Sequence, residues 1–293
     1  MHQGSQIQSG GYSPSAGSVD PSFRILKDLA RDLSSGQVSF PTFINATLKI
    51  RRALDDPNVD ADRMARIISS EPLLAAKLVQ VANSVALGVP GMPVADVKGA
   101  ILRVGYSNVH SIASAVAMAQ LVVAKEMKPF LKRAEAVWRH SLEVAAIAFV
   151  LARKLTRINP DEALFAGLVH DVGRFYLLSK APHYPELTAD PVALEAVLDE
   201  WHAPIGHAVL STFGLSDAVL QAVAEHESTS YPASPKTMSD VIILANMLSK
   251  GPNPLDRHNS TFRPAAVEDS KDLHELLEGS AETLHSLVAA FRG

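Results

Sequence analysis

The stretch EALFAGLVHDVGRFYLLSK, residues 162–180, has the apolar pattern of a buried helix, with two polar residues at its centre. His170 and Asp171 are adjacent, so in a continuous helix their side chains would diverge by about 100°. Gly167 and Gly173 flank the pair at a cost of about 1 kcal/mol each relative to alanine, which favours close approach of a neighbouring helix or a ligand. The stretch predicts a core helix whose polar pair is either a metal site or a tolerated polar pair.

The same helical period extends through most of the chain on both sides of this stretch. Asn159 and Pro160 form a start signal ahead of it, because asparagine caps helices and proline suits the first helical position. No segment alternates apolar and polar residues in the way that predicts a strand. The fold class is therefore expected to be all-α, with helices at about residues 25–34, 41–54, 61–70, 72–83, 94–103, 107–125, 134–155, 160–180, 191–213, 216–225, 237–250 and 272–291.

The predicted helices divide into two lobes that meet near residue 127. Residues 1–21 are rich in Ser, Gly and Gln and are expected to be disordered, since they cannot offset their ordering entropy. An N-terminal helical lobe is expected at 22–126 and a second lobe at 127–252. Residues 253–293 are expected to form a loop and a last amphipathic helix that packs on its own domain, with dimerisation as the alternative.

Composition excludes several classes of protein. The 293 residues are 47% hydrophobic and 20% charged with a net charge of −4, which is typical of a globular protein and argues against DNA binding. There is no cysteine, so any metal must be held by His, Asp or Glu. No secretory signal is visible, and the longest apolar tract, 112–124, is shorter than the roughly 20 residues that span a bilayer. We therefore expect a cytoplasmic protein without membrane contact.

The second lobe contains the histidines of interest. A helical bundle can gather ligands from several facing helices, although a buried histidine that bonds only to a neighbour is the alternative. His202 and His207 are five residues apart, so at most one of them is expected to be a ligand. The candidates, together with Asp171, are His140, His170, His202, His207 and His226.

Charged residues near these histidines have two interpretations each. Arg174 lies three residues after Asp171, so it either pairs with that carboxylate or binds an anion. Glu225 and Glu227 flank His226 and are expected to be solvated acids at a helix end. Spacing alone does not choose between these interpretations.

Five motifs follow one another along the chain: Glu71-Pro72, ANS at 82–84, GAILRVGYSNV at 99–109, WRHS at 138–141 and AGLVHDVGRFYLL at 166–178. Together and in this order they resemble the HDOD family, the HD-related output domain of bacterial signalling proteins. The order of the histidines and of EHE at 225–227 also resembles the HD superfamily of metal-dependent phosphohydrolases. The similarity covers about residues 40–250.

The resemblance implies a signalling output or interaction module whose second lobe is an HD-like helical bundle. No receiver, DNA-binding or membrane domain is visible beside this region, so a signalling protein partner is expected to act in trans. It also implies a metal site for a divalent ion such as Fe, Mn or Mg. Arg174 stands where the branch that cleaves cyclic dinucleotides has a phosphate-binding lysine. The positions that match metal ligands are His140, His170, Asp171, His202 and His226.

Departures from the enzymes argue against catalysis, so no catalytic residue is expected. EHE at 225–227 is one histidine short of the HHE of the enzymes. Asn246 stands in place of a closing aspartate, and a neutral amide is a weaker ligand than a carboxylate. The alternative function is a metal-dependent phosphohydrolase or phosphodiesterase that acts on nucleotides or cyclic dinucleotides. A sensor that binds a nucleotide without cleaving it is a third possible function.

Overall fold

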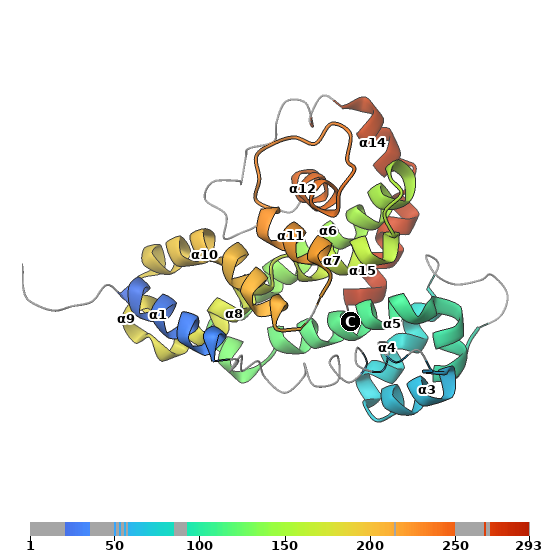
Figure 1. Cartoon of the computed structure of the whole chain (residues 1–293), viewed down its shortest axis with the longest axis horizontal. Helices are drawn as coiled ribbons and strands as arrows, with labels where there is room; N and C mark the ends of the chain where they lie inside the picture. Colours follow the sequence, from blue (N-terminus) through green and yellow to red (C-terminus); the bar gives the residue numbers. More distant parts are fainter. Residues whose placement is uncertain are drawn as a thin grey trace, which may run out of the picture.

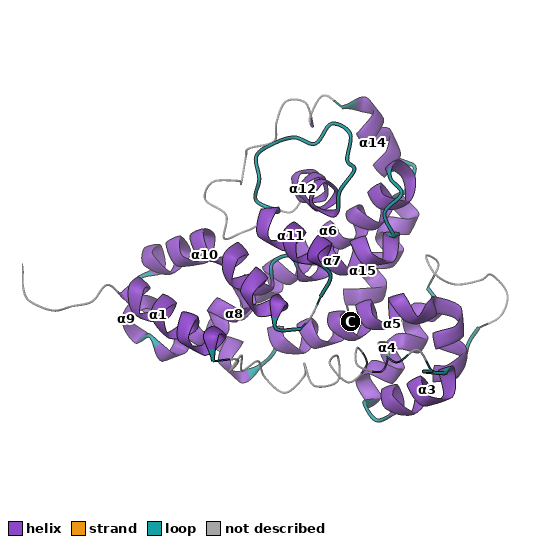
Figure 2. Ribbon diagram, viewed as in Figure 1, coloured by secondary structure: helices purple, strands orange, loops and turns teal. Residues whose placement is uncertain are grey.

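The computed structural model describes residues 21–35, 58–84, 93–213, 215–249 and 270–292, together with residues 50, 53, 56 and 267. Within these ranges the chain is helical and contains no strand, which confirms the all-α prediction (Figure 2). The predicted disordered segment 1–21 and the predicted helix at 41–54 lie almost entirely outside the described residues.

Helices α3 (Ala61–Ser69) and α4 (Pro72–Ala82) begin at the predicted residues, whereas α1 (Pro21–Ser34) begins before the predicted start near residue 25 and α5 (Val97–Val122) after the predicted start near residue 94. Asp60 caps α3 by accepting a hydrogen bond from the backbone N–H of Arg63, as expected of an aspartate at this position. Gly105 interrupts α5 with φ 79°, a left-handed conformation that glycine adopts without steric cost, so the two helices predicted here form one kinked helix.

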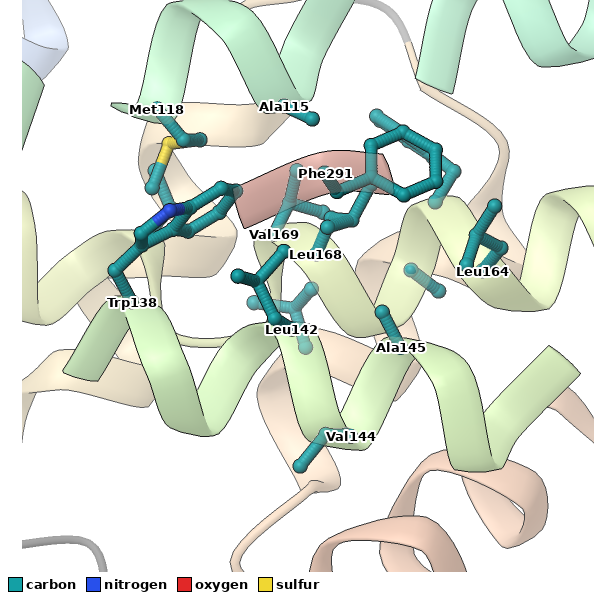
Figure 3. Packing of buried hydrophobic residues seen from close by; sticks show 14 of the residues in the cluster. Ala115, Met118, Trp138, Leu142, Val144, Ala145, Leu164, Leu168, Val169 and Phe291 are labelled. Atoms are coloured by element: carbon teal, nitrogen blue, oxygen red, sulfur yellow. The ribbon is translucent and has the colours of Figure 1, made fainter. Parts of the chain in front are cut away.

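Helix α6 (Leu131–Leu155) runs through the centre of the molecule, where α7 (Pro160–Val169) packs closely against it (Figure 1). A Cβ added at Gly167 would lie 2.5 Å from the Cα of Ala145, so only glycine allows this backbone spacing. Figure 3 shows the side chains that fill the space between α5, α6, α7 and the C-terminal helix: Ala115, Met118, Trp138, Leu142, Ala145, Leu164, Leu168 and Phe291.

The helix predicted over 160–180 is not continuous. Helix α7 ends at Val169 and α8 (Val172–Lys180) begins at Val172, so the histidine–aspartate pair forms a corner. Asp171 has φ −97° and ψ 15°, which takes its backbone out of the helical region. Asp favours helix ends over helix interiors, and here its carboxylate meets side chains from three other parts of the chain. The prediction of one helix was wrong because the apolar pattern passes unchanged through the corner.

The remaining helices surround α6, α7 and α8. Helix α10 (Pro191–Ser211) packs on α8, and α11 (Asp217–Glu225) lies between α10 and α12 (Met238–Leu248) (Figure 1). Gly173 sets the distance between α8 and α10, since a Cβ there would lie 1.9 Å from the carbonyl oxygen of His202. A short 3₁₀ helix precedes α6 and another follows α8. These 3₁₀ helices are η1 (Lys125–Phe130) and η2 (Ala181–His183), and helix α9 (Pro185–Thr188) comes after η2.

The C-terminal region contains two helices in place of the single helix predicted at 272–291. Helix α14 (Lys271–Glu278) is followed by Gly279 at its C-cap, and α15 (Ala281–Arg292) then packs on α6, α4 and α5. This confirms that the last helix packs on its own chain. At the other end, α1 packs on α9 and α10. The division into lobes near residue 127 stays a prediction. Among the described helices, none has the length and hydropathy that crossing a bilayer would require.

Candidate metal centre

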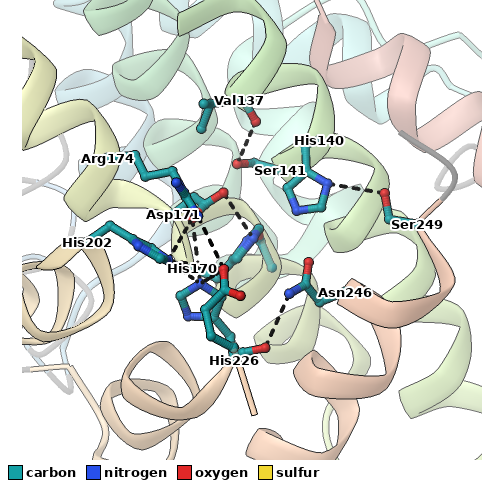
Figure 4. Close-up of polar contacts among 12 residues, drawn as sticks. Val137, His140, Ser141, His170, Asp171, Arg174, His202, His226, Asn246 and Ser249 are labelled. Carbon is teal, nitrogen blue, oxygen red and sulfur yellow. Dashed lines mark hydrogen bonds and ion pairs between the residues drawn. The ribbon is translucent and has the colours of Figure 1, made fainter. Parts of the chain in front are cut away.

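The five residues predicted as ligands come together at the junction of α6, α7, α8, α10 and α11 (Figure 4). Each is at most 5% exposed. His207, the other candidate, is half-buried and outside the groups of donor residues found in the described chain. The residues that converge are His140, His170, Asp171, His202 and His226.

Three of the histidines are oriented by their own helices. The Nδ1 atoms of His170, His202 and His226 lie 2.7, 2.8 and 2.7 Å from backbone carbonyl oxygens three or four residues earlier in the chain. A carbonyl oxygen only accepts, so each Nδ1 carries a proton and donates it. The Nε2 atom of each ring therefore remains as a possible ligand atom, and for His202 and His226 these atoms meet at 3.1 Å.

The first set of donor atoms comes from Asp171, His202, His226 and Glu227. Asp171 Oδ1 lies 3.7 and 3.6 Å from the Nε2 atoms of His202 and His226, and Glu227 Oε1 lies 3.2 and 3.5 Å from the same two atoms. Ligands bound at about 2.1 Å in a tetrahedron lie about 3.4 Å apart, which is the range seen here. The donor set therefore fits a single metal ion.

The second set consists of His140, His170 and Asp171, whose ligand atoms lie within 4.8 Å of one another. His170 Nε2 and Asp171 Oδ2, which are 3.5 Å apart, are buried and have no hydrogen-bond partner among the described residues. Buried polar atoms normally have partners, so these two atoms point to a ligand that binds between them. Asp171 belongs to both sets, and imidazole with carboxylate is a donor combination that divalent transition metals accept. The cluster can hold a metal ion.

Protonation in the cluster follows from burial and from neighbouring charges. Burial lowers the pKa of His140, and it lowers that of His170 to about 3. Burial also opposes charge on His226, but the carboxylates of Asp171 and Glu227, 3.6 and 3.5 Å from its Nε2, prevail and raise its pKa to about 10. The pKa of Glu227 is lowered despite burial, because the neighbouring imidazoles of His202 and His226 favour its charged carboxylate. Without a bound ion, a proton on His226 Nε2 would balance carboxylate charge inside the protein, and an ion bound at this nitrogen would take the place of that proton.

Arg174 is 1% exposed and binds three carboxylates. Its Nε lies 3.0 Å from Asp171, its Nη1 3.0 Å from Asp199 and its Nη2 3.3 Å from Glu227. Burial opposes its charge, but the three carboxylates raise its pKa above the ordinary value. Of the two alternatives left open by the sequence, the structure shows the pairing with Asp171. A role in binding an anion stays a prediction.

Two carboxylates of the site were not predicted. Glu227 was expected to be solvated, and this was wrong: its side chain is 30% exposed and turns back over the cluster just after the end of α11. Asp199 lies three residues before His202 on α10, a spacing that places both on one helix face and that could have indicated it. Asn246 donates from Nδ2 to the carbonyl oxygen of His226 at 3.2 Å and thus connects α12 to the end of α11.

The arrangement agrees with comparisons to known proteins. The model of the HDOD domain family matches residues 40–229, and the chain belongs to this family. A provisionally named metal-dependent phosphohydrolase from Shewanella amazonensis is 22% identical, with a TM-score of 0.69 over 92% of this chain and 99% of that one. A provisionally named signal transduction protein from Marinobacter aquaeolei is 18% identical, with a TM-score of 0.61 over 94% of this chain and 67% of that one. These similarities show the fold.

A protein of Treponema pallidum named only as uncharacterized is 23% identical over 234 residues, which are 75% of this chain and 44% of that protein. The chain thus spans less than half the length of the curated relatives that it matches.

Proposed function

We propose that this chain is a signalling output module of the HDOD family that acts through a protein partner in trans and does not turn over phosphate esters. The observation that carries the proposal is the state of Arg174. Its guanidinium matches a phosphate-binding position, yet it is buried and already bonded to Asp171, Asp199 and Glu227. A phosphate group would have to break one of these charge-assisted bonds and enter a cluster of buried histidines, at a large cost in free energy.

In this proposal the cluster binds a divalent ion as a structural or regulatory element. Four histidines and two carboxylates supply the donors, which favours Fe over Mg, because imidazole suits Fe whereas Mg prefers oxygen ligands. The ion would supply positive charge beside Asp171 and Glu227. Elemental analysis of the purified protein, compared with a His170→Ala variant, tests this part. Equal metal content in the two proteins would contradict it.

The absence of turnover is tested with a phosphodiesterase assay. The protein, loaded with Fe²⁺ or Mn²⁺, is given cyclic dinucleotides and mononucleotide phosphates, beside His170→Ala and Asp171→Ala variants loaded in the same way. We expect the three proteins to give the same background rate. A rate well above background that both substitutions abolish would overturn the proposal.

The second candidate function is a metal-dependent phosphohydrolase. The observation that favours it is the carboxylate of Asp171, which belongs to both donor sets, as in hydrolases that hold two ions about 3.5–4 Å apart. The same assay decides between the two functions. Isothermal titration calorimetry with cyclic dinucleotides, with and without metal, tests the sensor alternative: saturable heat without hydrolysis would support nucleotide binding without cleavage.

A further inference from the structure

His140 differs from the other three histidines of the cluster in how its ring is held. The other Nδ1 atoms donate to carbonyls of their own helices. The Nδ1 atom of His140 instead lies 3.2 Å from Oγ of Ser249, a residue 109 positions later at the end of α12 (Figure 4). The orientation of this ring therefore depends on a side chain from another helix.

The hydrogen bonds around Ser249 have a direction that the chemistry determines. Ser249 Oγ donates to Oε2 of Glu143 at 2.9 Å, and a carboxylate oxygen only accepts. The single hydroxyl proton is used in that bond, so Oγ accepts from His140, and Nδ1 of His140 carries a proton. This leaves Nε2 of His140 with its lone pair, as the nitrogen that can bind an ion beside His170 and Asp171.

We propose that Ser249 and Glu143 are positioning residues for His140 as a metal ligand. The inference rests on metal binding at the cluster, which is part of the proposed function. Hydrogen-bond partners of a metal-binding histidine hold its ring in one orientation and one tautomer. In the chain of hydrogen bonds from His140 through Ser249 to Glu143, here called the relay, the carboxylate of Glu143 makes the ligating nitrogen of His140 more basic. Helix α12 then supports both donor sets, since Asn246 bonds at the backbone of His226 and Ser249 bonds to His140.

The fit of the cluster to a metal has support that is independent of the relay. In the part of the chain that the structure describes, the buried atoms His170 Nε2 and Asp171 Oδ2 have no hydrogen-bond partner, and they belong to the donor set that contains His140. With Ser249 replaced by alanine, the ring of His140 loses the acceptor for its Nδ1 proton and can place either nitrogen toward that set. An ion bound there should therefore be held more weakly and in a less uniform geometry.

The test is a titration of the metal-free protein with Co²⁺, followed by its visible absorption. Ser249→Ala and Glu143→Gln should weaken binding of the ion held by His140 about 10- to 100-fold and change the absorption bands. Ser249→Thr keeps the hydroxyl and should restore both. Ser141→Ala is the matched control: Ser141 is buried beside His140, but its hydroxyl donates to the carbonyl of Val137, so Co²⁺ binding should not change.

The outcomes separate the relay from the metal site. If the unmodified protein binds Co²⁺ and Ser249→Ala binds it with equal affinity and spectrum, the relay is refuted while the metal site stands. If the unmodified protein binds no more Co²⁺ than His170→Ala, the metal site and the relay both fail. Thermal unfolding with EDTA identifies a variant that does not fold, in which case Glu143→Gln and Ser249→Thr carry the comparison.

Discussion

Replacement of Arg174 by methionine removes the positive charge that three carboxylates share, while keeping a long side chain in the core. The guanidinium is 1% exposed, and its bonds to Asp171, Asp199 and Glu227 are 3.0, 3.0 and 3.3 Å long. We expect the variant to fold less stably, because Asp171 is left buried among groups that no longer balance its charge.

The size of the loss follows from the burial of these groups. Breaking a buried ion pair by removing one partner costs about 3–5 kcal/mol. The three bonds do not contribute additively, because the carboxylates share one cation and loss of the buried guanidinium also removes its own desolvation cost. At roughly 2–4 °C per kcal/mol for a protein near this size, the melting temperature should fall by about 10 °C.

The assay is urea unfolding of the variant and the unmodified protein in EDTA, followed by circular dichroism. Arg24→Met is the control, because the Arg24–Glu186 pair lies at the surface with side chains 54% and 33% exposed. Exposed pairs contribute about 0.2–1 kcal/mol, so the control should change little. A loss for Arg174→Met no larger than that of the control would refute the view that this arginine balances the cluster.

Three further changes test other features of the structure. Gly173→Ala would place a Cβ 1.9 Å from the carbonyl oxygen of His202 and should reduce the free energy of unfolding by about 1–3 kcal/mol or more. Gly206→Ala, whose Cβ would have its nearest contact at 3.3 Å, should reduce it much less in the same urea assay. Equal losses would contradict the close packing of α8 on α10. Glu227→Gln removes a charged donor and should weaken Mn²⁺ binding at least about tenfold by calorimetry, while unchanged affinity would exclude Glu227 as a ligand. His226 has its pKa raised from 6.5 to about 10, so the stability that its charged form contributes is complete below pH 6.5 and is lost as the pH rises through 10. Urea unfolding of the metal-free protein between these pH values should show the decline, and His226→Asn should lack it. A decline of equal size in both proteins would disprove the raised pKa of His226.

The sequence predicted those parts of the fold that local signals encode. Capping by Asp60 and Asn159 is decided within a few residues, and the structure shows both caps. The corner at His170 and Asp171 was missed because the apolar period does not change there, while the contacts that orient the aspartate come from residues up to 55 positions away. Gly167 and Gly173 did indicate close helix approach, since only glycine accommodates the backbone spacing found there.

The sequence predicted the ligand residues of the candidate site better than the contacts around these residues. The histidines and Asp171 were indicated by the resemblance to a family, and the structure brings them together. The contacts around these residues were not predicted, because Glu227 lies 53 residues from Arg174 in the sequence and Ser249 lies 109 residues from His140. Such pairs depend on how α10, α11 and α12 pack, and no local spacing encodes that packing.

The packing of α15 determines which fragments of this protein are worth expressing. Residues 40–229, the range that the HDOD family model matches, exclude α15 and also α12 with its Ser249. A fragment cut at those limits would uncover the apolar surface of α6 that Leu287 and Phe291 protect. Aggregation of such a fragment would be caused by the loss of α12 and α15. Binding partners should therefore be sought with a polypeptide that retains residues up to at least 292.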